Sequence, residues 1–409
     1  MNERKTMKHL TIGIFALLCI NCYGQPYSKS WKDLNYAGDS FQYHRLDIYL
    51  PVIEKPTYPV VISIYGSAWF GNNLKGSDLA TFGKALLDAG FAVVTPNHRS
   101  SMDAKFPAQI QDIKAVIRFI RTNAAKYQID TSFIGINGFS SGGHLSALAG
   151  TSRFTKQFTV GSTTYDIEGN VGSDTTVSSS VHAVVDWSGP TDLLVLDSCR
   201  STPLHDGANS PESLLIGGSV QDNQDKAMLA NPITYIDAND PPFLILHGDA
   251  DQTVPSCQST LLFDALQKAN VPSQLVLIPN AQHGTGMFSE KYFKMMIDFF
   301  TTISGMTAVD VKESKNSSKF SSFSNYPNPF NPSTTIEYSL KDDSIIEIKI
   351  FDNFGRLVRS LFKGQSTSGT HNLAWDGRDD NDKQLSSGLY YYQIKSETFS
   401  SANKMLLLK

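Results

Sequence analysis

The sequence predicts a mostly parallel α/β sheet flanked by helices, followed by a small β-sandwich. Short, almost wholly apolar runs alternate with amphipathic stretches between residues 46 and 300, as in strands buried on both faces. A polar, Ser-rich stretch follows, and beyond it short strands of alternating polarity appear with no evident helix. With 409 residues, of which 41% are hydrophobic, the chain is long enough for two or three domains of ~150 residues each.

Six apolar runs are the candidate strands of the first domain, at residues 60–64, 91–95, 133–137, 181–186, 243–247 and 274–278. Helical patterns lie between them. Pro107 sits where a first helical turn would begin, and Ile110, Ile113 and Ile117 follow at helical spacing. Alternating strands and helices predict a parallel sheet covered on both faces. Residues 151–180, rich in Ser, Thr and Gly, are predicted to form an insertion or long loop.

The second domain is predicted to be an Ig-like β-sandwich, because its candidate strands are short and separated by Gly, Asn and Asp. These strands cover residues 336–340, 345–351, 371–375 and 390–394. The expected organisation is an N-terminal targeting segment, an α/β domain, a Ser-rich linker and the sandwich, at residues 1–24, 25–303, 304–324 and 325–409.

The N-terminus has the layout of a secretory signal peptide. Arg4, Lys5 and Lys8 precede an apolar run at residues 10–20, and small residues then lead to a cut after Gly24. The alternative is a short membrane anchor, but this run is too short to cross a ~30 Å hydrocarbon core. We therefore expect export from the cytoplasm.

Charge and hydropathy exclude two classes of partner. The net charge is −4 and the sequence has no long basic run, so we expect no nucleic-acid partner. No internal stretch reaches the ~18–20 apolar residues that a membrane span needs. Two of the four cysteines leave with the signal peptide. A disulfide between the other two, Cys199 and Cys257, and a pair of free buried thiols are equally compatible with the sequence.

The pentapeptide Gly138-Phe139-Ser140-Ser141-Gly142 follows one apolar strand and precedes a helical pattern. Gly-x-Ser-x-Gly at a strand-to-helix turn is the nucleophile elbow, which exposes the serine hydroxyl. The start of the helix adds partial positive charge where negative charge develops. Ser140 is therefore the candidate nucleophile.

A serine nucleophile needs a base and an orienting carboxylate. Asp249 and Asp251 follow the strand at 243–247, and His283 follows the strand at 274–278. The order serine, acid, histidine is the hydrolase order, and open α/β sheets bind ligands at these strand ends. The spacing alone does not choose between the two aspartates, since Asp249 is also suited to bracing the turn.

Residues 36–300 resemble the α/β-hydrolase esterases, in particular the bifunctional feruloyl and acetyl-xylan esterases. The matching stretches are LDIYLP (46–51), DIKAVIRFIRTNAAKY (112–127), GFSSGGHLSALAGTS (138–152), VVDWSGPTDL (184–193), PPFLILHGDADQTVP (241–255) and NAQHG (280–284). The resemblance implies an α/β-hydrolase fold and hydrolysis of acetyl or feruloyl esters on plant-type polysaccharide. The later aspartate of the HG-x-x-D-x-x-VP pattern maps to Asp251, which makes Asp251 the expected acid.

One departure from the family concerns the oxyanion hole. Members carry His-Gly-Gly where this chain has Tyr65-Gly66-Ser67, and a Cβ at Ser67 restricts the backbone. The backbone N–H groups of Ser67 and Ser141 are the expected donors, with Gly66 as a further one. Trp69 and Phe139 are candidates for the wall of an acyl pocket, although aromatic residues more often lie in the core.

Two histidines near these motifs have structural interpretations. His144 is predicted to be a packing residue, and His247, which closes a strand, is predicted to support the loop that carries the acid.

The tail resembles the type A C-terminal sorting domain of type IX secretion in Gram-negative bacteria. The stretches that carry this likeness are NYPNPFNPSTTIEYSL (325–340), IKIFDNFGRLVRSL (348–361), AWDGRD (374–379), SGLYYYQI (387–394) and NKMLLLK (403–409). The resemblance implies secretion machinery as a partner, passage through the periplasm, and release or surface attachment. The alternative is a carbohydrate-binding sandwich in which Tyr390, Tyr391 and Tyr392 stack on sugar, but adjacent strand positions face opposite sides.

These observations together predict a secreted serine carboxylic-ester hydrolase that needs no metal or organic cofactor. The alternatives are a short-acyl, lipase-like carboxylesterase and, less favoured, a secreted serine peptidase. The non-enzyme alternative is an inactive hydrolase scaffold that binds ligands at the cell surface. Intact Ser140, Asp251 and His283 argue against it.

Overall fold

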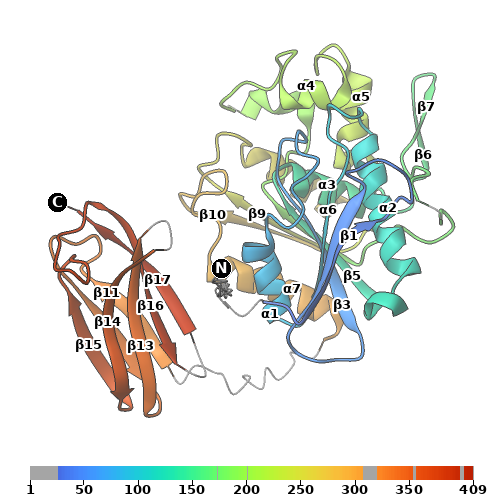
Figure 1. The fold of residues 1–409 in the computed structure, drawn as a ribbon. Coiled ribbons are helices and arrows are strands. Elements are labelled where there is room, and N and C mark those ends of the chain that lie inside the picture. Colours follow the sequence, from blue (N-terminus) through green and yellow to red (C-terminus); the bar gives the residue numbers. More distant parts are fainter. Residues whose placement is uncertain are drawn as a thin grey trace, which may run out of the picture. The chain divides into compact units, whose positions relative to one another are not determined.

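The computed structural model describes residues 26–172, 174–199, 201–306, 320–352, 356–396 and 400–408. The chain divides into two compact units, residues 1–308 and 309–409 (Figure 1). The predicted signal peptide, residues 1–24, lies outside the described residues, as does most of the predicted linker.

The first unit is built on an eight-stranded sheet of order β1-β2-β4-β3-β5-β8-β9-β10. These strands are β1 (Lys29–Asn35), β2 (Arg45–Leu50), β3 (Tyr58–Ile64), β4 (Ala92–Pro96), β5 (Ile129–Phe139), β8 (Ala183–Trp187), β9 (Phe243–Gly248) and β10 (Ser273–Ile278). Strand β2 pairs antiparallel with both β1 and β4, and all the other pairings are parallel. The α/β prediction is confirmed, and the parallel strands bring their carboxyl ends to one edge.

Helices cover both faces of this sheet (Figure 1). They are α1 (Lys84–Asp88), α2 (Ala108–Thr122), α3 (Ser141–Thr151), α4 (Pro211–Ile216), α5 (Gln224–Ala230), α6 (Cys257–Lys268) and α7 (Glu290–Ser304). Short helical turns occur at η1 (Leu79–Gly83), η2 (Ala125–Tyr127), η3 (Leu193–Val195), η4 (Asp197–Cys199) and η5 (Pro232–Tyr235). In the described part of the chain, no helix combines the length and apolar character that crossing a bilayer requires.

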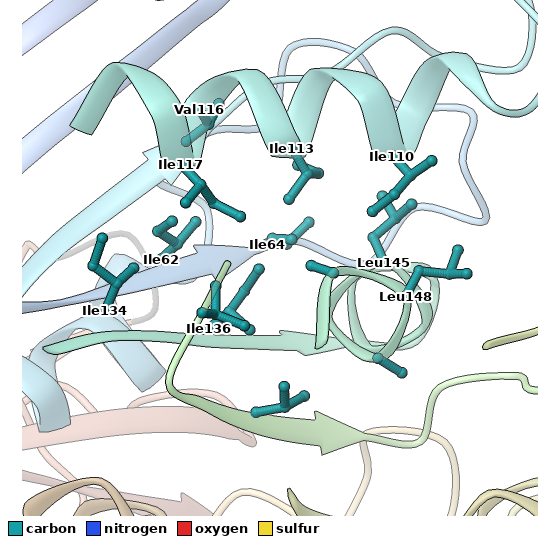
Figure 2. Packing of buried hydrophobic residues seen from close by; sticks show 14 of the residues in the cluster. Ile62, Ile64, Ile110, Ile113, Val116, Ile117, Ile134, Ile136, Leu145 and Leu148 are labelled. Atoms are coloured by element: carbon teal, nitrogen blue, oxygen red, sulfur yellow. The ribbon is translucent and has the colours of Figure 1, made fainter. Parts of the chain in front are cut away.

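The alternation of side chains along the strands creates two cores. Ile62 and Ile64 of β3 point toward α2 and α3, where Ile113, Ile117 and Leu145 pack against them (Figure 2). The opposite face packs its own apolar cluster against α1 and α7. Burial on both faces explains why these strands read as continuous apolar runs in the sequence.

The first unit differs from the sequence prediction at its N-terminal strands and in one loop. Strands β1 and β2 were not expected; β1 is a polar edge strand with no fully buried residue. The predicted loop at 151–180 contains a short antiparallel hairpin of β6 (Gln157–Val160) and β7 (Thr163–Asp166). Each strand of this hairpin is only four residues long, and β7 (TTYD) has a single aromatic residue, so the alternation is too short to predict the hairpin.

The second unit is an Ig-like sandwich of two antiparallel sheets, ordered β11-β12-β15 and β14-β13-β16-β17. Its strands are β11 (Phe320–Tyr326), β12 (Thr334–Leu340), β13 (Ser344–Asp352), β14 (Leu357–Ser366), β15 (Gly369–Trp375), β16 (Gly388–Ser396) and β17 (Ser400–Leu407). Its core, which includes Ile348, Trp375 and Tyr392, is separate from those of the first unit. Strand β11 begins inside the segment predicted as linker, because Phe323 packs into this core.

Candidate active site

The candidate nucleophile lies at a one-residue turn between β5 and α3. Ser140 has φ +57° and ψ −123°. A residue other than glycine keeps this strained backbone conformation only when the surrounding structure enforces it. Its N–H donates to the Trp187 carbonyl at 2.8 Å, and its carbonyl accepts from the His144 N–H at 3.0 Å. The strained conformation is therefore fixed from both sides of the peptide.

The glycines of the motif allow this turn to pass against the neighbouring strand. A Cβ on Gly142 would lie 2.1 Å from the Ile64 carbonyl oxygen, and one on Gly138 would lie 2.3 Å from the Gly142 backbone. Gly66 faces the same turn, since a Cβ there would lie 2.8 Å from the Phe139 carbonyl oxygen. These positions exclude any side chain, which explains the Gly-x-Ser-x-Gly pattern sterically.

The structure brings the three residues predicted from their order together at the carboxyl edge of the sheet. Nε2 of His283 lies 3.0 Å from Oγ of Ser140, and Nδ1 lies 2.7 Å from Oδ2 of Asp251. Because Nδ1 faces a carboxylate, it carries the ring proton and leaves the Nε2 lone pair directed at the serine hydroxyl. This geometry suits removal of the serine proton during nucleophilic attack.

Asp251 is buried, with 5% of its surface exposed, yet it is well supplied with donors. Its Oδ1 accepts from the backbone N–H groups of Thr253 at 2.9 Å and Val254 at 3.0 Å. Burial alone would raise the pKa of Asp251, but hydrogen bonds from His247 and His283 outweigh that effect and lower the pKa to about 2. The carboxylate is therefore ionised at neutral pH.

Asp249, the other candidate acid, has a different contact. Its Oδ1 accepts from the Asn280 N–H at 2.7 Å, while the N–H of Ala250 donates to the Ala281 carbonyl at 3.0 Å. Asp249 thus joins the loop after β9 to the loop after β10 and braces the turn that carries His283. Nδ1 of His283 is bonded by Asp251 and not by Asp249.

The expected oxyanion donors lie next to Ser140 but are not all free. The Ser67 N–H donates to the Ser141 hydroxyl at 2.9 Å, a contact that the sequence did not reveal. Ser141 opens α3, so its own N–H has no acceptor within the helix. The turn holds Ala68 and Trp69 at φ +51° and +58°, in the left-handed region.

The two predicted pocket residues have different surroundings. Phe139 is half-buried, with its ring centroid 4.7 Å from that of His283 and 5.3 Å from that of Phe288. Trp69 is only 1% exposed and donates through its indole nitrogen to Nδ1 of His144 at 3.2 Å. The expectation that Trp69 lines an acyl pocket is therefore corrected: its side chain is needed to satisfy a buried histidine. Phe288, which the sequence did not single out, borders the site instead.

The two neighbouring histidines are structural, as expected. His144 also contacts the Ala230 carbonyl at 2.7 Å, and burial lowers the pKa of its ring to about 4. His247 is fully buried and lies 2.7 Å from the Val254 carbonyl, within the loop that carries the acid. Both interpretations of these residues are confirmed.

The sequence left open whether the two remaining cysteines form a disulfide, and in the structure they do. Cys199 and Cys257 are bonded, with their Cα atoms 6.2 Å apart. Cys257 is the first residue of α6, directly after the loop that carries Asp251. The disulfide ties that loop to the segment after β8. Among the residues the structure describes, no group of three or more His, Cys, Asp or Glu is arranged to hold a metal ion.

The fold and the motifs at this edge define the class of the first unit, an α/β-hydrolase of the esterase type. The profile of the BD-FAE family matches residues 46–266, over half of the chain, and the chain belongs to this family. The FlgD Ig-like domain family matches residues 331–400, which agrees with the sandwich. The sorting role of that sandwich stays a prediction.

Individual relatives give the same class. A structure described as a truncated carbohydrate esterase from gut microbiota is 50% identical, with a TM-score of 0.67, and the match covers 69% of this chain and 98% of that one. A bifunctional GH43-CE protein of Bacteroides eggerthii is 55% identical, with a TM-score of 0.65, over 68% of this chain and 35% of that chain. Esterase LipQ of Mycobacterium tuberculosis is 28% identical over 61% of this chain and 55% of its own length. The chain spans about half the length of the curated relatives it matches.

The disulfide gives the first testable prediction. Replacing Cys199 and Cys257 together by serine is expected to lower the free energy of unfolding by about 2–4 kcal/mol, because the cross-link restricts the unfolded chain. Denaturant unfolding of the oxidised protein and the double variant measures this difference. A reductant should destabilise the wild type and leave the double variant unchanged. Equal stability of wild type with and without reductant would contradict the prediction.

Proposed function

We propose that this chain is a secreted serine carboxylic-ester hydrolase that removes acetyl or feruloyl groups from polysaccharide such as xylan. The observation that carries the proposal is the continuous contact from Ser140 through His283 to Asp251, at 3.0 and 2.7 Å. The substrate class is supported by similarity to proteins described as carbohydrate esterases, which are 50% and 55% identical to this chain.

In this mechanism His283 takes the Ser140 proton as Oγ attacks the ester carbonyl carbon. The imidazolium that forms is stabilised by Asp251, whose carboxylate is already ionised. The tetrahedral oxyanion accepts a hydrogen bond from the Ser141 N–H. The backbone N–H groups of Gly66 and Ser67 are the other proposed donors. The Ser67 N–H becomes available once the Ser141 hydroxyl turns away from it.

The second half of the reaction uses the same groups. The tetrahedral intermediate collapses, its carbon–oxygen bond to the alcohol breaks, and His283 returns the proton to the leaving alcohol. His283 then takes a proton from water as the water oxygen attacks the acyl-Ser140 carbonyl. Collapse of that second intermediate releases the carboxylic acid and restores the serine hydroxyl. We expect Phe139 and Phe288, whose ring centroids lie 5.3 Å apart, to contact the acyl or alcohol part of the ester.

A short-acyl carboxylesterase is the second candidate. It is favoured by similarity to curated proteins whose names specify only an esterase, such as LipQ. The two candidates share the mechanism and differ in the alcohol that leaves.

Substitution of the nucleophile tests both the mechanism and the substrate. For Ser140→Ala we expect kcat/KM on p-nitrophenyl acetate to fall at least about 10⁴-fold, because the attacking atom is lost. Wild type should also release acetate from acetylated xylan or ferulate from methyl ferulate. Turnover of p-nitrophenyl acetate alone would favour the short-acyl esterase. An equal rate in wild type and Ser140→Ala would exclude Ser140 as the nucleophile.

The two aspartates form a matched pair for assigning the acid. Asp251→Asn should lower kcat by about 10⁴-fold, because an amide no longer holds the proton on Nδ1 of His283. Asp249→Asn keeps an acceptor oxygen for the Asn280 N–H, so kcat should stay within about threefold of wild type. Steady-state kinetics on one ester measures both. A larger loss in Asp249→Asn than in Asp251→Asn would reverse the assignment.

We further propose that the Ig-like unit directs type IX secretion, a role that rests on its sequence resemblance to sorting domains. In a Gram-negative host with that machinery, the full chain should reach the medium or cell surface. A chain ending at residue 308, the end of the first unit, should remain in the periplasm with its esterase activity intact. Fractionation with an activity assay measures this. Equal export of both chains would refute the sorting role.

A further inference from the structure

The two residues that bind Asp251 through their N–H groups are themselves held by two histidines. Thr253 and Val254 donate to Oδ1 of Asp251 at 2.9 and 3.0 Å. The Thr253 carbonyl lies 2.9 Å from Nε2 of His205, and the Val254 carbonyl lies 2.7 Å from Nε2 of His247. Each of these two residues is therefore bound on both of its backbone polar groups, once by the acid and once by an imidazole.

His247 contacts the loop from inside the sheet. It lies in β9 and is fully buried, with Nε2 facing both the Val254 carbonyl at 2.7 Å and Oδ2 of Asp251 at 3.4 Å. Two acceptors at one nitrogen require that Nε2 carries a proton. Nδ1 lies 2.6 Å from the hydroxyl of buried Ser259, which is able to donate to it. The ring is thereby fixed in the tautomer that donates to the loop.

His205 contacts the same loop from a different segment of the chain, the one that connects η4 and α4. It is 5% exposed, and its Nδ1 lies 2.9 Å from Oε2 of Glu212, which is 3% exposed. Nε2 faces the Thr253 carbonyl, an acceptor, so Nε2 carries a proton and donates to it. Burial would lower the pKa of His205, but Glu212 outweighs burial and raises it.

The segment that carries His205 is anchored beside the acid loop by two further links. The Thr202 N–H donates to the Gln252 carbonyl at 2.7 Å, and the Cys199–Cys257 disulfide joins the flanking elements. Oδ1 and Oδ2 of Asp197 accept the backbone N–H groups of His205 and Asp206, at 2.7 and 2.9 Å. The segment that carries His205 is therefore anchored by contacts other than the one between His205 and Thr253.

We propose that His205 and His247 are positioning residues for the acid: together they clamp the Thr253–Val254 backbone so that Asp251 keeps its Oδ2 on His283. This inference rests on the proposed function, because it assigns the clamp to the reaction of Ser140. The titratable groups that face the clamp are Glu212 and Asp197 beside His205, and Asp251 and Asp186 beside His247.

The first test removes the His205 half of the clamp without leaving a buried charge unpaired. The double variant His205→Leu/Glu212→Leu replaces both partners by apolar side chains. We expect kcat to fall about tenfold or more, because small displacements of catalytic groups are costly, while KM stays within about twofold. The acid limb of the kcat/KM profile should move to lower pH, because a displaced carboxylate stabilises the His283 imidazolium less.

Conservative and control variants separate positioning from stability. His205→Gln/Glu212→Gln is compared with His205→Leu/Glu212→Leu, and His247→Gln with His247→Leu. The glutamine at position 205 or 247 keeps a side-chain N–H donor, so it should recover most of the kcat that the leucine variant loses. His182→Leu is the matched control, because His182 accepts the Ile134 N–H at 2.9 Å at the start of β8, remote from the acid loop. The His182→Leu variant should have a lower free energy of unfolding than wild type and the same pH profile of kcat/KM. Folded clamp variants with unchanged kcat and an unchanged acid limb would overturn the proposal.

Amide hydrogen exchange tests the clamp independently of activity. The Thr253 and Val254 amides should exchange faster in the clamp variants than in wild type, and by more than global destabilisation in His182→Leu produces. If the wild type hydrolyses no ester, the proposed function fails. The exchange rates of these two amides would still show whether the histidines hold the loop. Unchanged protection of both amides in the variants would overturn the clamp itself.

Discussion

The close approach of β3 to the start of α3 is the constraint on which the site depends. A Cβ on Gly142 would lie 2.1 Å from the Ile64 carbonyl oxygen, so the helix begins in direct backbone contact with the strand. Strand β5 must therefore turn into α3 within a single residue, and Ser140 takes a positive φ to do so. The same turn exposes the hydroxyl and places the free N–H groups of a helix start beside it.

Burying a carboxylate costs free energy unless hydrogen-bond donors stabilise its charge. The loop after β9 supplies such donors to its own aspartate. Asp251 receives two N–H groups from its own loop and the His283 imidazole from the next one. Asp249 then links these two loops through the Asn280 N–H. The two aspartates of this loop therefore have separate roles: Asp251 orients the base, and Asp249 braces the turn that carries it.

The sequence predicted those features that local chemistry fixes. Apolar runs located the parallel strands, and the order of Ser140, Asp251 and His283 along those strands predicted their meeting, because parallel strands end at one edge. Features set by tertiary packing were missed. Trp69 looks like a pocket aromatic in sequence, but a buried histidine requires its indole N–H. His205 lies in a segment without regular pattern, and only the folded chain brings it to Thr253.

The two units bury separate hydrophobic cores, and this bears on how much of the chain the candidate site needs. The sandwich encloses its own aromatic cluster around Trp375 and Tyr392, while the sheet of the first unit is covered on both faces by its own helices. Because every residue of the candidate site lies in the first unit, neither the strained turn at Ser140 nor the support of Asp251 depends on the sandwich. A domain with its own core can in principle fold by itself, so we expect a chain without the sandwich to keep the catalytic geometry.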